Sequence, residues 1–208
     1  MSDIPDRRSQ KSTRALWLGL LTLLQDHDWA DITVQMIADR ADIARSTFYG
    51  HYQTKQDLLN AGFSLATDEI RKAVLARKVQ EGQLATVDWL IAHVSDSQGF
   101  MRRVQGTSAG LVILHRFRAT FAVVLRDELA RRGHLPSDLP FNFQVGGLFY
   151  VVEQWLQSKD GLDAKALGAA LSAQILALQS NTAAKIVPAA PPKKNFLQKI
   201  FRPPYTSA

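Results

Sequence analysis

Residues 31–59 contain the side chains whose types and spacing are best suited to chemistry, and that chemistry is the reading of a nucleic acid. Within the stretch DITVQMIADRADIARSTFYGHYQTKQDLL, Arg45, Ser46 and Thr47 stand together. In the DNA major groove an arginine pairs with guanine through two hydrogen bonds, and a short hydroxyl contacts either base of a pair. A helix that presents these three side chains on one exposed face would therefore be a candidate for contact with DNA.

The elements expected to position these side chains are two short helices joined by a tight turn. Thr33 is a suitable N-cap for a helix over 34–40. Asp42 occupies the turn, where aspartate tolerates a left-handed backbone better than most residues do. A second helix over 45–52 buries Phe48 and exposes hydroxyls and a base. This arrangement is typical of a helix-turn-helix.

A further helix begins at Thr54-Lys55-Gln56-Asp57, which matches a capping box. Lys55 lies in the first turn of this helix, where the positive end of the helix dipole disfavours a cation. A DNA phosphate held between the lysine and the helix N-terminus would remove that conflict. Residues 44–56 include no acidic residue, so the local charge also favours contact with phosphates.

This pattern resembles the DNA-binding domain of the TetR family of transcriptional regulators. The resemblance covers about residues 10–62. It departs from the family at Asp42, where glycine is usual, and at Ala44, where a capping serine is common. The positions that carry the resemblance are Ile32-Thr33, Ile37-Ala38, Ile43, Ser46-Thr47-Phe48-Tyr49, His51-Tyr52 and Lys55.

The resemblance implies a role for each matched polar position on a double-stranded DNA operator. The positions that face base edges or the nearby backbone are Gln35, Arg45, Ser46, Thr47 and Gly50. The positions that grip phosphates are Thr33, Tyr49, His51 and Lys55. Helix packing explains His51 about equally well, and Phe48 and Tyr52 are expected in the core.

Helical periodicity runs through the whole chain without a strand pattern, so the expected fold class is all-α. Helices are expected over 9–25, 84–94, 106–132, 141–158 and 163–180, besides three helical pieces within 33–66. The resemblance implies an N-terminal three-helix DNA-binding domain with a helix-turn-helix, followed by a larger helical ligand-binding and dimerisation domain. The expected boundaries are a flexible N-terminus 1–8, a DNA-binding domain 9–62, an effector-binding and dimerisation domain 63–182, and a basic, Pro/Ala-rich flexible tail 183–208.

The last two expected helices are apolar around most of their circumference, which requires burial on most sides. We expect one face to pack on the subunit's own core and another on a second copy, so a homodimer is favoured over a central core helix in a monomer. The residues expected at the dimer interface are Leu148, Val151, Val152, Trp155, Leu167, Leu171 and Ile175.

Aromatic, methionine and histidine side chains of the larger domain are candidates for the wall of an effector cavity. The resemblance implies that such a cavity binds an unidentified small molecule. Trp89 and His93 lie one helical turn apart and so share a face. The full candidate set is Trp89, His93, Phe100, Met101, His115, Phe121, Tyr150 and Trp155. Ordinary core packing is the alternative for each of them.

The composition is that of a globular protein, with 208 residues of which 46% are hydrophobic and 21% charged. The net charge of +6 comes mainly from residues 183–208, which carry five basic residues and no acidic one. The total charge therefore says little about nucleic-acid binding by the folded body. Because the longest apolar run falls far short of the ~20 residues that span a bilayer, and no secretion signal is recognisable, we expect a cytoplasmic protein.

Catalytic signatures are not found in the sequence. The patterns GxSxG, Walker A, HExxH and GxGxxG do not occur, and no two histidines lie four residues apart. The chain has no cysteine, which excludes disulfides, thiolate metal ligands and a thiol nucleophile. We therefore expect no enzyme activity, no cofactor and no metal site.

These observations predict a homodimeric repressor that a small-molecule effector releases from a near-palindromic operator. Two alternatives remain open. In the first, a DNA-bound protein exerts its effect through a weak membrane or protein contact made by residues 194–201, where apolar residues alternate with lysines at helical spacing. In the second, the chain is a helical small-molecule-binding protein without specific DNA affinity.

Overall fold

The structure is a computed structural model that describes residues 7–104, 106–158 and 163–181, and within these ranges all regular structure is helical. The expected all-α class is confirmed. The helices are α1 (Arg7–Leu23), α2 (Val34–Arg40), α3 (Arg45–His51), α4 (Lys55–Ala76), α5 (Ala85–Asp96), α6 (Gln98–Val104), α7 (Ser108–Arg131), α8 (Asp138–Gln157) and α9 (Ala164–Asn181). The expected tail 183–208, including residues 194–201, lies outside the described residues.

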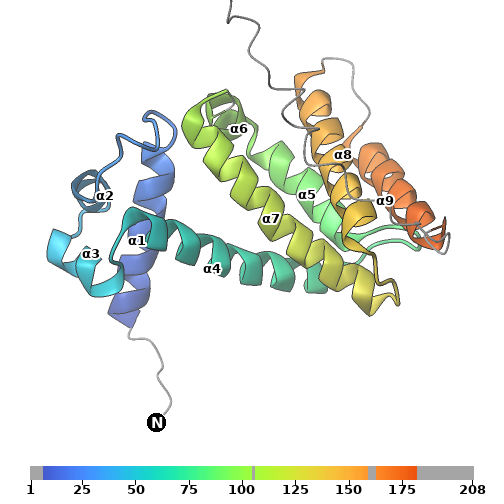
Figure 1. Ribbon diagram of the computed structural model, residues 1–208, viewed down its shortest axis with the longest axis horizontal. Coiled ribbons are helices and arrows are strands. Elements are labelled where there is room, and N and C mark those ends of the chain that lie inside the picture. Colours follow the sequence, from blue (N-terminus) through green and yellow to red (C-terminus); the bar gives the residue numbers. More distant parts are fainter. Residues whose placement is uncertain (1–6, 105, 159–162, 182–208) are drawn as a thin grey trace, which may run out of the picture.

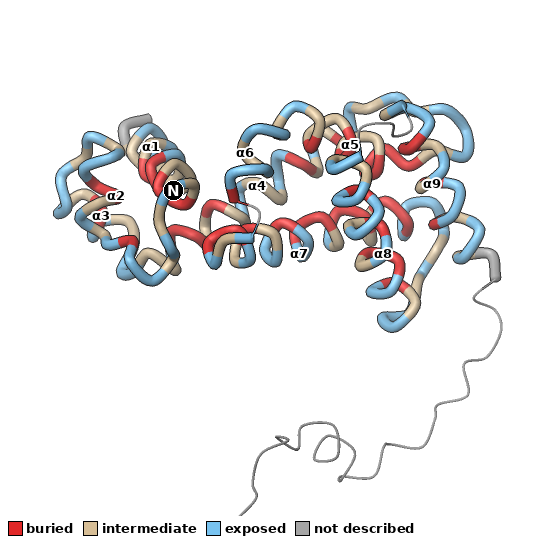
Figure 2. Tube along the Cα trace, turned by 90° about the horizontal axis from the view of Figure 1, so that it is seen from above, coloured by how far each residue is buried: buried red, intermediate tan, exposed pale blue. Residues whose placement is uncertain are grey.

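Two groups of helices are joined by α4 (Figure 1). Helices α1, α2 and α3 gather around the first turns of α4 at one end of the molecule. Helices α5, α8 and α9 lie at the other end, and α7 runs beside α4 between them (Figure 1). The two short helices α2 and α3 are thus far from α8 and α9, as the view from above also shows (Figure 2).

The hydrophobic core forms two clusters, one in each group of helices. The cluster of the N-terminal group contains fully buried leucines of α1 and the rings and aliphatic chains of α2, α3 and α4 that pack on them. It also includes Val104, Ala109 and Ile113 from α6 and α7, so the larger domain completes the core of the smaller one. The expected boundary between residues 62 and 63 falls inside α4, which continues without a break.

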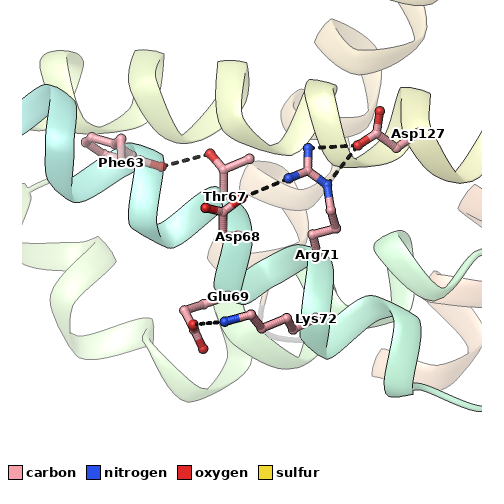
Figure 3. Close-up of polar contacts among 7 residues, drawn as sticks. All are labelled: Phe63, Thr67, Asp68, Glu69, Arg71, Lys72 and Asp127. Atoms are coloured by element: carbon pink, nitrogen blue, oxygen red, sulfur yellow. Dashed lines mark hydrogen bonds and ion pairs between the residues drawn. The ribbon is translucent and has the colours of Figure 1, made fainter. Parts of the chain in front are cut away.

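An ion-pair network attaches α4 to α7 (Figure 3). The guanidinium of Arg71 donates from Nε to Asp127 Oδ2 at 3.0 Å and lies 2.9 Å from it through Nη2. The same guanidinium donates to Asp68 one turn earlier on α4, at 2.9 Å. The pair of Glu69 and Lys72 lies on another side of α4 (Figure 3). Because both partners of Arg71 are at least one-third exposed, each pair contributes about 1 kcal/mol or less, and the network orients the helices more than it stabilises them.

The first turn of α5 receives its hydrogen-bond partners from two distant helices. The carboxylate of Glu128 on α7 accepts from the backbone N–H groups of Ala85 at 2.9 Å and Thr86 at 2.8 Å. The hydroxyl of Ser172 on α9 accepts from the N–H of Leu84 at 3.1 Å. These contacts satisfy N–H groups that have no partner within the helix itself. The buried carboxylate of Glu128 on α7 therefore caps the N-terminus of α5, a role that a side chain close in sequence usually has.

Two features of the fold differ from the sequence expectation. Helix α4 extends to Ala76, well beyond the short piece expected before residue 66, because Ile70 and Val74 continue its buried stripe. Helix α6 was not expected, since Gly99 near its start and its seven-residue length leave little periodicity to recognise. Helix α7 is long and apolar enough to resemble a membrane span, but ten of its residues are buried among the other helices, as in a central core helix.

Candidate DNA-binding surface and effector cavity

The turn between α2 and α3 has the geometry expected from its residues. The Thr33 hydroxyl accepts from the Met36 N–H at 3.2 Å and so caps α2. Asp42 has φ 54°, the left-handed conformation expected at the turn. The N–H of Ile43 then donates to the carbonyl of Ala38 at 3.0 Å and closes the turn. Ala44, at the N-cap of α3, makes no side-chain cap, as the absence of a serine there predicts.

Helix α3 has one buried face and one open face. Phe48 is completely buried, whereas the neighbouring Tyr49 is 48% exposed. On the open face the Arg45 guanidinium donates to the Tyr49 hydroxyl at 3.2 Å and lies 5.4 Å from the ring centre. A methyl group added at Gly50 would meet no atom within 4 Å. This outer surface of α3 is therefore available to a large partner, and two of its side chains support each other.

The other predicted contact residues lie on or beside the same surface. The Gln35 side-chain amide donates to Asp39 on the next turn of α2, at 2.7 Å, and both are exposed. Of the remaining positions, Ser46 is exposed and Thr47 and His51 are half-buried. The His51 ring lies 6.1 Å from that of Tyr52, in keeping with the packing alternative for this histidine.

The start of α4 shows a role for Lys55 that the sequence did not suggest. The predicted capping box is present: the Thr54 hydroxyl accepts from the Asp57 N–H at 3.1 Å, and the Asp57 carboxylate accepts from the Thr54 N–H at 2.9 Å. The Lys55 ammonium donates to the carbonyls of Trp29 and Ile32 at 2.5 and 2.7 Å, and its Nζ lies 4.8 Å from the Trp29 ring centre. Partial burial lowers the pKa of Lys55. Lys55 thus connects the loop between α1 and α2 to the start of α4. Its proposed contact with a DNA phosphate stays a prediction.

Comparison with known proteins agrees with this geometry. The family model described as "Bacterial regulatory proteins, tetR family" matches residues 20–61, which run from the end of α1 into α4. Over these residues the N-terminal helices match the TetR family. These helices form a DNA-binding helix-turn-helix domain of the TetR type, as the matched residues in the sequence predicted.

One curated relative shares this domain. An uncharacterized HTH-type transcriptional regulator of Bacillus subtilis (strain 168), YxbF, is 36% identical over 66 residues. The match covers 31% of this chain and 17% of YxbF, so the chain spans less than a fifth of the length of this relative. The shared part supports the assignment of the N-terminal domain.

Solved structures of TetR regulators share the fold over most of the chain. The TetR transcriptional regulator of Streptococcus agalactiae 2603V superposes with a TM-score of 0.59 and 24% identity, covering 83% of this chain and 97% of that one. A TetR-family regulator of Marinobacter aquaeolei VT8 superposes with a TM-score of 0.54 and 20% identity, covering 81% and 96%. The fold of the larger domain is therefore also that of TetR regulators.

A cavity of about 570 Å³ lies where the DNA-binding domain meets the larger domain, and we call it the junction cavity. Its lining comes from α1, α4, α5, α6 and α7, and from Ser97 between α5 and α6. Of the eight predicted effector-contact residues, the four that line it are Trp89, His93, Phe100 and Met101. Of the other predicted effector-contact residues, Phe121 is fully buried in the core, and His115 and Tyr150 are exposed on the surface. Trp155 is half-buried and does not line this cavity.

The wall of the junction cavity is uncharged apart from one carboxylate at its edge. His93 stacks on Trp89, with ring centres 4.7 Å apart and an interplanar angle of 11°. Burial lowers the pKa of His93 below the usual histidine value, and the nearby Asp96 opposes this only in part. Its ring is therefore uncharged at neutral pH. Glu69, which also lines the cavity, is exposed and paired with Lys72 at 2.9 Å.

The predicted dimer interface stays a prediction, and its residues differ in how exposed they are within one subunit. Most of its members are buried within the subunit: Leu148, Val152, Leu167 and Ile175 are at most 4% exposed. Trp155 and Leu171 are half-buried, and Val151 is exposed. Periodicity placed these residues on helices α8 and α9 but did not show which face meets the subunit's own core. The apolar residues that α8 leaves exposed are Leu139, Phe143, Tyr150 and Val151.

The residues that connect the two domains were not predicted from the sequence. Trp17 and Leu21 line the junction cavity from α1, and Phe63 and Ile70 line it from α4. A signal was present, because Trp17 and Leu21 form a second apolar stripe on α1 beside its stripe of leucines. A second stripe indicates a second packing partner, which is the junction with the larger domain.

Proposed function

We propose that the protein is a homodimeric, cytoplasmic repressor that binds a near-palindromic operator and is released from it by a small molecule. The observation that carries this proposal is the open outer surface of α3, on which Arg45, Ser46, Tyr49 and Gly50 face away from the core. A recognition helix of this kind enters the major groove, where arginine and hydroxyl side chains read base edges. The phosphate contacts proposed for Thr33, Tyr49, His51 and Lys55 would fix its register.

The exposed face of α8 supports the homodimer. Phe143 is 76% exposed and Tyr150 is 63% exposed, although both are large and largely apolar. Gly147 lies between them, and a methyl group added there would meet no atom within 4 Å. A second copy packed on this face would bury the apolar patch and approach closely at the glycine. Because α8 lies at the opposite end from α3, such a dimer keeps both recognition helices free (Figure 1).

A footprint of the purified protein on the DNA that flanks its own gene tests the proposal. We expect a protected inverted repeat whose half-sites lie about 34–36 Å apart along the DNA, one for each recognition helix. The protection should persist near physiological salt concentration. Protection that occurs only at low salt and has no sharp boundary would reflect phosphate binding alone and would refute the proposed sequence-specific function.

Substitutions on α3 separate base reading from phosphate contact. Arg45→Ala should weaken operator binding by about 10- to 100-fold and flatten the preference at one base pair, since a bidentate arginine–guanine pair contributes about 1–3 kcal/mol of discrimination. Tyr49→Phe, which removes an uncharged hydroxyl, should weaken all sequences alike and leave the salt dependence of binding unchanged. Binding is measured by fluorescence anisotropy on a set of single-base operator variants.

Arg131→Ala is the matched control for Arg45→Ala, because Arg131 is an exposed arginine at the far end of α7. Its operator affinity should equal that of the unmodified protein. If Arg45→Ala retained the full base preference, its assignment as a base-reading residue would be wrong.

A further inference from the structure

The junction cavity is bounded by the DNA-binding domain itself, not only by the larger domain. Trp17 and Leu21 on one face of α1 form part of its wall. On another face of the same helix, Leu16 and Leu20 are completely buried in the cluster that contains Phe48 of the recognition helix. A molecule in the cavity would therefore touch the helix on which the helix-turn-helix packs.

Trp17 is held tightly at the crossing of α1 and α4. A methyl group added at Gly62 would lie 2.1 Å from the Trp17 ring, so only glycine leaves room for the indole at this position. The ring also meets Phe63 edge to face, with centres 5.4 Å apart. Because the indole has no free space on the α4 side, a ligand that pushes Trp17 toward α4 has to move α1 relative to α4.

Helix α6 provides a second connection between the cavity and the DNA-binding domain. Phe100 and Met101 line the cavity, and Val104, one turn later, is fully buried in the core of the DNA-binding domain. Next to Val104, the Arg103 guanidinium donates from Nε to the side-chain oxygen of Gln25, just after α1, at 2.8 Å. The part of the cavity wall formed by α6 is thus packed directly against the core of the DNA-binding domain.

The lining determines which ligand chemistry fits. Aromatic rings converge on the cavity from α1, α4, α5, α6 and α7: Trp17, Phe63, Trp89, Phe100 and Phe117. No lysine or arginine is among the described lining residues, which leaves an anion without a counter-charge, and the one lining carboxylate, Glu69, is already paired with Lys72 and so is not free for a cation. Polar groups are few. Within the described part of the chain His93 makes no side-chain hydrogen bond, so its ring nitrogens are available to a ligand, as is the Ser97 hydroxyl.

We propose that the junction cavity binds an uncharged, flat aromatic compound with one hydrogen-bonding group, and that this compound contacts Trp17 of the DNA-binding domain directly. The rings supply stacking surfaces, and His93 or Ser97 pairs with the polar group. The regulatory meaning of the site rests on the proposed function. A compound that favours a different angle between α1 and α4 shifts the protein away from the form that fits DNA.

Fluorine NMR of the full chain tests the contact without DNA. Labelling with 5-fluorotryptophan gives one resonance for each of Trp17, Trp29, Trp89 and Trp155, assigned with single tryptophan-to-phenylalanine variants. On addition of 2-naphthylmethanol, the resonances of Trp17 and Trp89 should shift most. The chemical shift of Trp155, which does not line the cavity, should not change. If the Trp89 resonance shifts and the Trp17 resonance does not, the proposed direct contact of the ligand with α1 is wrong. If neither resonance shifts, the proposed binding site is wrong.

A matched set of naphthalenes tests the charge preference by calorimetry. We expect 2-naphthylmethanol to bind at least 10-fold more tightly than 2-naphthoate or 2-naphthylmethylammonium, which carry the same rings with a negative or a positive charge. Ala66→Phe, which fills the cavity from α4, should abolish binding, and Leu65→Phe, at an exposed position of the same helix, should not. Tighter binding of either ion, or equal binding by both variants, would refute the proposal.

The test of ligand binding in the junction cavity can fail or succeed independently of the test of operator binding. Ligand binding and the fluorine spectra require no DNA, while the footprint requires no ligand. A protein that binds 2-naphthylmethanol at Trp17 but protects no operator would retain the cavity assignment and lose the regulatory role. A protein that protects an operator but binds none of the naphthalenes would retain the regulatory role and lose the cavity assignment.

Discussion

Replacing Phe48 with alanine should abolish operator binding although Phe48 faces away from DNA. The side chain is completely buried between α1, α2 and α4, and its ring lies 5.6 and 5.8 Å from those of Tyr49 and Tyr52. Removing a buried phenylalanine typically costs about 3–5 kcal/mol, because apolar contacts are lost and a cavity remains. A small domain has little more stability than this. Urea unfolding followed by circular dichroism measures the loss.

Tyr49 provides the matched control on the next residue of the same helix. Tyr49→Ala removes an aromatic ring of similar size from an exposed position, so the free energy of unfolding should change by about 0.5 kcal/mol or less. Its operator affinity should nevertheless fall, because the phenol is a proposed phosphate contact and supports Arg45. Equal stability of the two variants would show that α3 does not pack on its Phe48 face.

Replacing Glu128 with alanine should destabilise the larger domain by about 3 kcal/mol. The substitution leaves the N–H groups of Ala85 and Thr86 buried without an acceptor, and each such group costs about 1–3 kcal/mol. The Arg132 guanidinium, which donates to the same carboxylate at 2.9 Å, also loses its partner. Thermal and urea unfolding followed by circular dichroism should report the change.

Asp127→Ala is the control for the substitution at Glu128. It removes a carboxylate from the adjacent residue, but the pair of Asp127 with Arg71 is partly exposed, so the expected cost is about 1 kcal/mol or less. Glu128→Gln keeps one acceptor oxygen and should be intermediate. An equal loss in the alanine variants at 127 and 128 would show that the hydrogen bonds to α5 contribute nothing beyond surface charge.

The DNA-binding domain was largely predictable because its determinants are local. Thr33 caps α2, Thr54 and Asp57 form a capping box, and Asp42 adopts a left-handed turn, and each of these depends on residues within three or four positions. Amphipathic periodicity then placed Phe48 in the core. The hydrogen bonds of Lys55 could not be predicted, because their carbonyl acceptors lie 23 to 26 residues away in the sequence, where spacing carries no information.

The larger domain was predictable only as a set of helices. Helices α8 and α9 were expected from composition, but their apolar residues divide between a core face and an exposed face, which periodicity could not distinguish when nearly every face is apolar. Only part of the wall of the junction cavity was predicted, because its residues come from helices far apart in the sequence. Trp89 and His93 share a helix, whereas Trp17 reaches the same space from the other domain.

The sequence by itself determined the all-α class and the TetR-type helix-turn-helix, because caps, turns and amphipathic stripes follow from neighbouring residues. Only the tertiary structure decided that Glu128 caps a helix 43 residues away, that Leu148 and Ile175 belong to the core, and that α1 forms part of the wall of the junction cavity. These features depend on which faces of separate helices meet. That choice results from the packing of the whole chain and leaves no fixed spacing in the sequence.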